Sequence, residues 1–359
     1  MTASVHGPVD VVCLGESMVT FLPTQAGRLA DVPSFVRGIG GAESNVACAL
    51  AAAGHRTRWV GRVGADGFGD HLVSAIAAYG VDTSAVARDP ERPTGVYFRT
   101  ATDRATDAHE VVYYRAGSAA SAMSPHTVPS GAIRSGRVLH LSGITAALSP
   151  DCLALMRDLA TRRDGGPLVS FDVNHRPGLW GDPSAAGVLL ELARGADIVF
   201  VGEDEAEQAW GVRGADAIRA ALPEPSVVVV KRGAAGAVSF TRRPERHSAP
   251  DPGAVTDTDT DADTVTTVPA PRVTVTAPVG AGDAFAAGFL SATLRGLTAG
   301  QRLRHGHLWA AAALTVPGDL AAPPAAGHAD RLAALDDEAW GRLHLGPGWT
   351  GEDQEVRTP

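Results

Sequence analysis

The sequence is almost without lysine: Lys231 is the only one in 359 residues, and every other strongly basic side chain is an arginine. Acidic residues outnumber basic ones, 40 to 31, which gives a formal net charge of -9. This balance leaves no excess of basic residues to form a nucleic-acid-binding face, so we expect no nucleic-acid partner. The net charge favours solubility and does not identify a partner by itself.

Cysteine is also scarce. Cys13, Cys48 and Cys152 lie far apart in apolar surroundings, so we expect buried free thiols and no disulfide framework. Residues 1–10 lack a cationic start followed by an apolar run, which predicts no signal peptide. No apolar stretch is long enough to cross a bilayer, so no membrane partner is expected. These observations together predict a cytoplasmic protein.

Short apolar segments are plentiful, and 45% of the residues are hydrophobic, which is ample for a large core. Strands are predicted at 11–14, 58–63, 138–141, 168–173, 198–201 and 227–230, and helices at 44–53, 68–79, 152–161, 185–193 and 204–210. Strands that alternate with helices favour an α/β fold with a mostly parallel sheet covered on both faces. We predict a single domain over residues 10–330.

Four segments interrupt this alternation. Residues 16–38 and 95–115 are mixed or β-rich and predict a small accessory sheet over one edge of the core. Residues 248–267 are rich in Pro, Asp and Thr and predict an acidic low-complexity loop. Residues 346–359 predict a disordered tail.

The sharpest motif is the run 278–285, which opens a long apolar helix. Small residues at Gly280, Ala281 and Gly282 let the backbone approach a ligand closely, and backbone N–H groups at a helix start attract an anion. A carboxylate at Asp283 would repel that anion, but it could take a proton from an attacking hydroxyl group. The alternative is that Asp283 only caps the helix.

A second cluster precedes the helix at 44–53. Gly40 and Gly41 suit a tight turn, and Asn45 could contact a hydroxylated ligand; the alternative is an ordinary glycine-rich helix start. The cluster does not fit G-x-G-x-x-G, because Glu43 stands where the third glycine is needed. The sequence also contains no G-x-x-x-x-G-K-[ST] run, so neither a dinucleotide fingerprint nor a P-loop is supported.

A third cluster follows the strand at 168–173. Asp172, Asn174 and Arg176 alternate beyond its end, and ligands of open α/β sheets lie past the carboxyl ends of the strands. The alternative is a polar loop with local hydrogen bonds. His175 is interpreted as a loop residue, because no Cys/His spacing supports zinc.

Together and in this order, these motifs resemble those of the ribokinase-like (PfkB) family of carbohydrate kinases. The resemblance also includes the runs 61–69 and 231–237, and it covers roughly residues 11–324. It implies a Rossmann-like three-layer α/β sandwich with a small β-sheet lid, which the segments at 16–38 and 95–115 match. It also implies ATP as phosphoryl donor, Mg²⁺ as metal, and a small sugar or nucleoside phosphorylated on a hydroxymethyl group.

The resemblance assigns roles residue by residue. Asp283 matches the catalytic base, and Gly280, Ala281 and Gly282 match the anion hole. The residues assigned to ATP are Lys231, Gly233, Gly236 and Gly282. Glu205 matches an acidic position that contacts the metal indirectly. A homo-oligomer formed through the lid is also compatible with the family.

Within the family, the sequence is most similar to the 2-keto-3-deoxygluconate kinases. The residues expected around the substrate are Gly40, Gly41, Asn45, Tyr97, Tyr113 or Tyr114, Arg115, Asp172, Asn174 and Arg176. An acid sugar carries a carboxylate, and arginine is the side chain best suited to bind one with two hydrogen bonds. Two alternatives remain open: a kinase for a neutral sugar such as fructose or ribose, and a non-catalytic sugar-binding regulator.

Two positions depart from the family pattern. Ala277 stands where relatives commonly have an Asp that helps to hold a monovalent cation, which predicts a weak response to K⁺. Gly202 stands where an Asn is frequent near the Mg²⁺ and phosphate region. The expected reaction is phosphorylation of the acid sugar on its terminal hydroxyl group.

Overall fold

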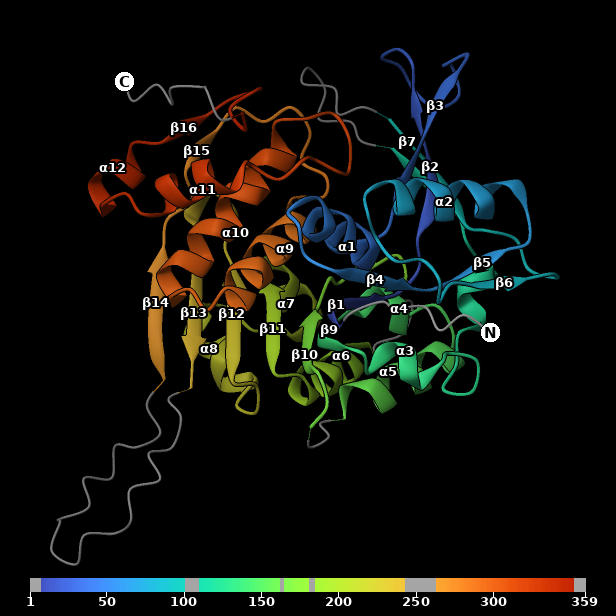
Figure 1. Ribbon diagram of the computed structural model, residues 1–359, viewed down its shortest axis with the longest axis horizontal. Helices are drawn as coiled ribbons and strands as arrows, with labels where there is room; N and C mark the ends of the chain where they lie inside the picture. Colours follow the sequence, from blue (N-terminus) through green and yellow to red (C-terminus); the bar gives the residue numbers. More distant parts are fainter. Residues whose placement is uncertain (1–7, 101–109, 162–164, 181–184, 243–262, 352–359) are drawn as a thin grey trace, which may run out of the picture.

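A computed structural model of the chain describes residues 8–100, 110–161, 165–180, 185–242 and 263–351. In this part of the chain, eight strands form the main sheet (Figure 1). Their order is β14 (Thr264–Val268), β13 (Ala237–Thr241), β12 (Val227–Lys231), β11 (Ile198–Gly202), β10 (Leu168–Asp172), β9 (Gly136–Ser142), β1 (Val9–Leu14) and β4 (Thr57–Val60). The strands from β12 to β4 pair in parallel, and β13 and β14 add an antiparallel edge.

Successive residues of each central strand enter two different hydrophobic clusters. Val11 and Phe200 lie in one cluster, whereas their neighbours Val12 and Val201 lie in the other. Side chains of a strand alternate between the two faces of the sheet, so a strand buried on both faces has to be apolar throughout. This explains why the apolar segments identified these strands correctly, and the predicted α/β sandwich is confirmed.

Helices cover both faces of the sheet (Figure 1). One layer contains α1 (Ala42–Ala52), α2 (Gly67–Ala78), α9 (Ala281–Leu294), α10 (Ala299–Leu314), α11 (Ala326–Ala333) and α12 (Asp337–Gly341). The opposite layer contains α3 (Ser130–Ile133), α4 (Gly143–Ala146), α5 (Pro150–Ala160), α6 (Ala185–Gly195), α7 (Glu203–Trp210) and α8 (Ala215–Ala221). The 3-10 helices η1 (Ala119–Ala122) and η2 (Gly233–Ala235) complete the helical elements of the described residues. The described helices include none that is both long enough and apolar enough to cross a membrane.

The predicted accessory sheet is present and stands apart from the main sheet (Figure 1). It consists of β3 (Phe35–Gly40), β2 (Met18–Pro23), β7 (Val96–Arg99) and β8 (Val111–Tyr114), in this order. We call these four strands the lid. Two minor sheets pair β5 (Arg62–Gly64) with β6 (Ala87–Asp89) and β15 (Arg272–Val273) with β16 (His344–Leu345). The strand predicted over 58–63 is therefore two strands, β4 and β5.

Two predictions near the carboxyl terminus need correction. The loop predicted over 248–267 falls partly outside the described residues, but 264–267 belong to β14, and Asp263 forms an ion pair with Arg219 at 2.5 Å. The β-branched Thr and Val residues of β14 suit an edge strand, because backbone pairing with β13 does not require an apolar face. The tail predicted from 346 is packed as far as Trp349, which is 4% exposed, so the domain extends beyond residue 330.

Candidate functional site

The site is built at the carboxyl ends of three adjacent parallel strands. Asp172 ends β10, Gly202 ends β11 and Lys231 ends β12, with Gly202 and Lys231 paired in register. Lys231 Nζ lies 3.0 Å from both carboxylate oxygens of Asp172. This ion pair passes across the end of β11, the strand that lies between β10 and β12 and ends at Gly202. The sequence predicted this edge as the ligand-binding edge, and the structure brings these residues together there.

Helix α9 brings Asp283 to the same edge. Oδ2 of Asp283 accepts a hydrogen bond from the side-chain amide of Asn45 in α1, at 2.8 Å. Burial raises the pKa of Asp283 to about 7, and the nearby Asp172 carboxylate adds to this rise. The Asn45 hydrogen bond and the charges of Arg176 and Lys231 act in the opposite direction. A carboxyl group poised near neutral pH is suited to accept a proton in a reaction.

The start of α9 depends on a glycine. Gly280 adopts φ +73°, and a Cβ atom there would collide with the carbonyl oxygen of Asp319. Gly280 is the N-cap residue and has no side chain that could accept a hydrogen bond from the first backbone N–H groups of α9. The first turn, with Ala281 and Gly282, thus presents a positive helix end beside Asp283.

A buried network connects the lid to this loop. The hydroxyl group of Tyr97 in β7 donates a short hydrogen bond to Oδ2 of Asp319, and Arg99 binds Oδ1 of the same carboxylate at 2.6 Å. Burial and the Asp319 carboxylate raise the pKa of Tyr97, so its hydroxyl stays protonated and can donate. A Cβ at Gly40 would collide with the Tyr97 hydroxyl, which explains why β3 ends in a glycine there.

The lid tyrosines, which the sequence could not separate, lie on opposite faces of β8. Tyr113 pairs with Tyr97, and their ring centroids are 5.4 Å apart, whereas Tyr114 packs edge-on against Phe98. Tyr113 is therefore the one beside the site. Arg115 is 5.8 Å from the centre of the Tyr113 ring and forms a short ion pair with the buried Glu16.

The loop after β10 contributes the remaining predicted residues. Asn174 adopts φ +40° and is buried, and its side-chain oxygen has no hydrogen-bond partner among the described residues. The Asn45 side-chain oxygen is likewise without a partner there. Arg176 is 53% exposed and approaches Glu205 only to 3.8 Å. The other oxygen of Glu205 accepts the N–H of Gly202 at 2.7 Å.

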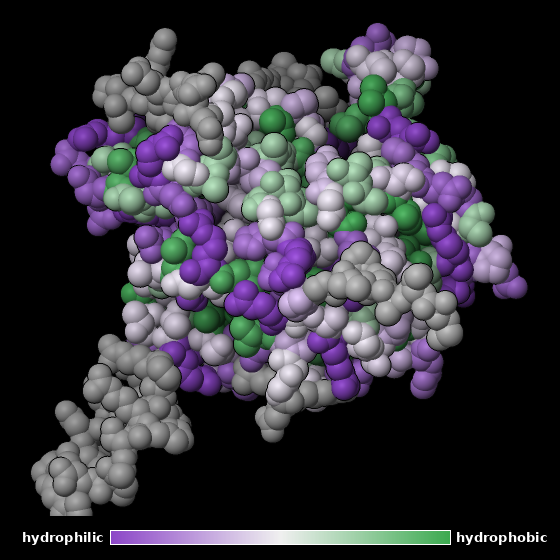
Figure 2. All heavy atoms as spheres, viewed as in Figure 1, coloured by the Kyte–Doolittle hydropathy of each residue, from purple (hydrophilic) through white to green (hydrophobic). Residues whose placement is uncertain are grey.

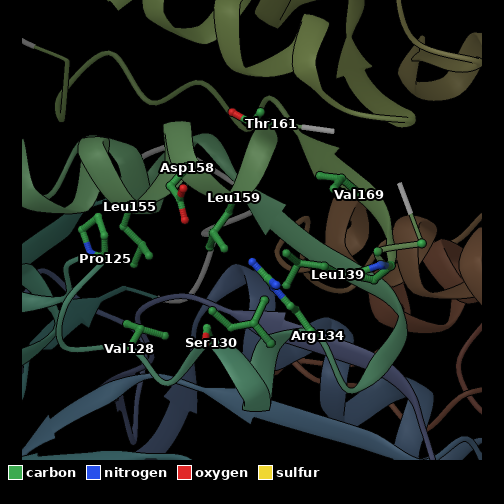
Figure 3. Close-up of a pocket in the computed structure, with 14 residues that line it drawn as sticks. Pro125, Val128, Ser130, Arg134, Leu139, Leu155, Asp158, Leu159, Thr161 and Val169 are labelled. Atoms are coloured by element: carbon green, nitrogen blue, oxygen red, sulfur yellow. The ribbon is translucent and has the colours of Figure 1, made fainter. Parts of the chain in front are cut away.

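Other predicted positions lie around these groups. Gly41 precedes α1, and Gly233 and Gly236 lie in the turn after Lys231, both with positive φ. Among the described residues, no group of three or more His, Cys, Asp or Glu side chains could hold a metal ion. A cavity of about 160 Å³ lies elsewhere, beside α5, where Arg134 and Asp158 point into it (Figure 3). It contains none of the predicted site residues.

Sequence reasoning missed three residues of the site. Arg99, Glu16 and Asp319 were not predicted as site residues, although Glu16 and Asp319 are buried in it. Arg99 lies in the β-rich segment 95–115 without belonging to a motif, and neither Glu16 nor Asp319 was given a role from the sequence. Burying a charged side chain is costly unless it is paired with an opposite charge. The ion pairs Arg99–Asp319 and Arg115–Glu16 join segments that are far apart in the sequence, so local sequence does not reveal them.

Comparisons with known proteins identify the family to which the chain belongs. The model of the pfkB family carbohydrate kinases matches residues 9–326. The 2-dehydro-3-deoxygluconokinase of Bacillus subtilis (strain 168) is 34% identical over 320 residues, covering 87% of this chain and 91% of the relative. The enzyme of the same name from Thermoproteus tenax is 32% identical, covering 90% and 94%.

More distant similarity extends to other sugar kinases. Probable fructokinase-3 of Arabidopsis thaliana is 31% identical over 238 residues, covering 65% of this chain and 68% of the relative. Among solved structures, a PfkB protein from Polaromonas sp. JS666 superposes with a TM-score of 0.73 at 32% identity, covering 87% of this chain and 97% of that one.

Proposed function

Because the chain belongs to the pfkB family of carbohydrate kinases, it is an ATP-dependent carbohydrate kinase, and we propose that its acceptor is 2-keto-3-deoxygluconate. This acid sugar is also called 2-dehydro-3-deoxygluconate, the name carried by the two relatives above. The proposed product is its 6-phosphate.

The observation that carries the catalytic part of the proposal is the placement of Asp283. Its carboxylate is held by Asn45, has a pKa raised to about 7 by burial, and stands at the positive start of α9. In the proposed reaction, Asp283 takes the proton of the terminal hydroxyl group of the sugar. At the same time, the oxygen of that hydroxyl group forms a bond to the γ-phosphorus of ATP. The bond from that phosphorus to the bridging oxygen breaks, and ADP leaves with the electron pair.

The anion hole supplies the complementary charge. Backbone N–H groups of Ala281 and Gly282 in the first turn of α9 would face the transferred phosphoryl group, whose negative charge they stabilise. The side-chain amide oxygens of Asn45 and Asn174 are buried and have no partner among the residues that the structure describes, so they are available to accept hydrogen bonds from sugar hydroxyls. These groups support a polyhydroxylated acceptor.

Recognition of the carboxylate is assigned to Arg176. Arg115 and Arg99 are each committed to a buried carboxylate, Glu16 and Asp319. Arg176, in contrast, is half exposed and only loosely approached by Glu205. Arg176 donates a hydrogen bond to the carbonyl oxygen of His175 at 3.2 Å but has no carboxylate nearer than that of Glu205 in the described part of the chain, so it is the cation best placed to bind an acid sugar.

Mg²⁺ fits this site as a metal carried by the nucleotide. Sugar kinases of this family use ATP with Mg²⁺. Mg²⁺ usually keeps several waters and binds through one or two carboxylates plus substrate phosphates, so the described residues need no cluster of ligands. Glu205 is the carboxylate we assign to it, in an indirect contact through water held by the Glu205 oxygen that is not engaged with Gly202. Bound there, the ion would neutralise charge on the phosphates.

The test is an ADP-release assay on the purified enzyme with 2-keto-3-deoxygluconate, fructose, ribose and a sugar-free control. We expect the highest kcat/KM for the acid sugar. A higher value for fructose would favour the neutral-sugar kinase, which the similarity to a fructokinase supports. Sugar binding without ADP release from any substrate would favour a non-catalytic regulator.

The lid also carries a surface through which two copies of the chain could associate. Val36, Tyr113 and Tyr114 are at least 50% exposed there, and hydrophobic residues are visible on the lid in Figure 2. We propose that a second copy of the chain covers this surface. Light scattering on the purified protein tests this proposal, because a monomer at micromolar concentration would contradict it.

A further inference from the structure

The first turn of α1 is buried although its side chains are polar. Glu43, Ser44 and Asn45 follow one another there, and they are 0%, 1% and 6% exposed. The Ser44 hydroxyl group donates to that of Ser17 at 3.0 Å, and Asn45 donates to Asp283 at 2.8 Å. Ser and Asn are weaker helix formers than Ala, so helix propensity does not explain this run. The residue types at this helix start are explained by the contacts that they make with distant segments.

The side chain of Glu43 joins α1 to the end of β9. Its Oε1 atom accepts hydrogen bonds from the hydroxyl groups of Ser142, which ends β9, and Thr145 in α4, at 2.7 and 2.9 Å. On its other side, a Cβ atom on Gly15 would lie 2.2 Å from the carboxyl carbon of Glu43. The missing side chain of Gly15 therefore leaves the space that this carboxyl group fills. Glu43 is held between β9, α4 and the residue that follows β1.

The surroundings of Glu43 favour a neutral carboxyl group. Burial raises its pKa, against the hydrogen bonds from Ser142 and Thr145 and the charge of Arg115. Its Oε2 atom has no hydrogen-bond partner among the residues that the structure describes. Burial and, to a smaller extent, Glu43 raise the pKa of Cys13, so this neighbouring thiol is neutral as well. A carboxylate with one unpaired oxygen would be costly here, whereas a neutral group can still accept both hydrogen bonds.

The contacts of Glu43 are made two residues before Asn45, which holds Asp283. Groups that touch a reacting atom have to be kept close to the productive geometry by the residues behind them. We propose that Glu43 is a positioning residue, whose carboxyl group fixes the start of α1 against the sheet so that the Asn45 amide reaches Asp283. The proposal rests on the proposed role of Asp283 as base and not on which sugar is the acceptor. The alternative is that Glu43 contributes only to stability.

Three variants distinguish these two roles. Glu43→Ala removes the acceptor of two hydrogen bonds, whereas Glu43→Gln keeps a neutral acceptor of similar shape. Thr57→Val is the matched control, because the buried Thr57 hydroxyl group donates to the carbonyl oxygen of Ala47 at 3.2 Å and so anchors α1 to β4 farther along the helix. The measurements are kcat and the pH profile of kcat/KM in ADP release, with thermal melting of each variant.

Glu43→Ala should lower kcat by about a hundredfold, the loss that a misplacement of about 1 Å can cause. The midpoint of its pH profile should rise from about 7 by about one pH unit, because Asn45 no longer lowers the pKa of Asp283. A direct loss of charge does not explain such a rise. The substitution leaves in place the charges that act on Asp283, which are those of Asp172, Arg176 and Lys231.

Glu43→Gln should keep the wild-type midpoint, and Thr57→Val should lose stability without moving it. A Glu43→Ala enzyme that melts earlier but keeps the wild-type midpoint would overturn the proposal. Equal rises of the midpoint in Glu43→Ala and in either of the other two variants would do the same. If Glu43→Ala does not fold, Thr145→Val takes its place, because it removes one of the two donors; an unchanged midpoint there counts equally against the proposal.

A second measurement does not depend on activity. Asn45 and Asn174 are the only asparagines of the chain, so asparagine with an isotope-labelled side-chain nitrogen gives two amide signals in nuclear magnetic resonance. Asn45→Leu identifies the signal of Asn45. In the wild type this signal should change around pH 7 as Asp283 ionises, and in Glu43→Ala the change should be smaller. An equal change in both proteins would overturn the proposal, whereas an enzyme inactive on every sugar would overturn only the proposed function.

Discussion

The charged groups of the lid and those of the sheet edge are arranged differently. In the lid, Arg99 and Arg115 are paired with Asp319 and Glu16, and all four side chains are less than 10% exposed. At the sheet edge, Arg176 and Lys231 are 53% and 17% exposed, and Asp283 is held by an amide and not by a cation in contact. Fully paired charges hold structure together, whereas incompletely paired ones remain available for reaction.

This comparison predicts that substitutions at the sheet edge affect turnover first and substitutions in the lid affect stability first. The most informative measurements therefore record both properties for each variant.

Replacing Asp283 with Asn should produce the largest loss. The shape is kept and the proton acceptor is removed, so kcat should fall by about a hundred- to ten-thousandfold. ADP release measures the effect, and isothermal titration with ATP should still detect binding. Near-normal kcat in Asp283→Asn would remove this residue from the role of base.

Breaking the lid pair should mainly affect folding. Arg99→Met leaves Asp319 buried without its cation, and removing one partner of a buried ion pair costs about 3–5 kcal/mol. Urea unfolding measures this loss. Arg28→Met is the control, because Arg28 pairs with Asp31 in an exposed position, so its loss should leave the free energy of unfolding nearly unchanged. Equal losses in the two variants would contradict the distinction drawn here.

Substitutions of Arg176 and Arg115 should distinguish recognition of the substrate carboxylate from stabilisation of the fold. Arg176→Ala should weaken kcat/KM for the acid sugar by about 1.5–3 kcal/mol, the value of a charge-assisted hydrogen bond, with a smaller effect on a neutral sugar. Arg115→Ala should lower stability by leaving Glu16 unpaired. If Arg176→Ala affects acid and neutral sugars alike, Arg176 does not bind the carboxylate.

The pH dependence should report on Asp283. Its carboxylate is the active form and its pKa is raised to about 7, so kcat/KM should rise as the pH increases through 7. Asn45→Leu removes a hydrogen bond that lowers this pKa, so the rise should move to higher pH. Charges facing Asp283 are those of Asp172, Arg176 and Lys231. A rise near pH 4 in the wild type would contradict this assignment.

The same raised pKa has a consequence for stability. The folded state binds this proton more tightly than the unfolded chain, so the contribution of Asp283 to stability is greatest at low pH. It is lost as the pH rises from about 4, the unfolded value, through 7. Asp283→Asn should therefore be more stable than the wild type above pH 7, as thermal melting would show.

The smallest effect is expected from monovalent cations. Ala277 is buried and offers no side-chain oxygen, and the Thr276 hydroxyl already donates to the carbonyl of Thr315 at 3.3 Å. Hard cations need several oxygen ligands, so turnover should be similar in sodium, potassium and tetramethylammonium salts of equal ionic strength. Strong activation by potassium alone would show that other oxygen atoms complete a site.

Much of the fold and half of the site could be read from local sequence. The strands β10, β11 and β12 are apolar throughout because both faces are buried, and the motif at 280–283 carries its own glycines and carboxylate. The carboxyl-terminal part was harder. Strand β14 buries only Val268 of its five side chains, so backbone pairing with β13 largely defines it, and Trp349 is buried by contacts with distant residues.

The sequence by itself determined the parallel sheet, the edge on which ligands bind, and the residue types gathered there, because side-chain periodicity and glycine geometry are local properties. Only the tertiary structure decided which charges are paired. Asp319 meets Arg99 and Tyr97 across more than 200 positions, and Asn45 meets Asp283 across 238. Electrostatic interactions depend on distance in space and on burial, and sequence spacing records neither of them.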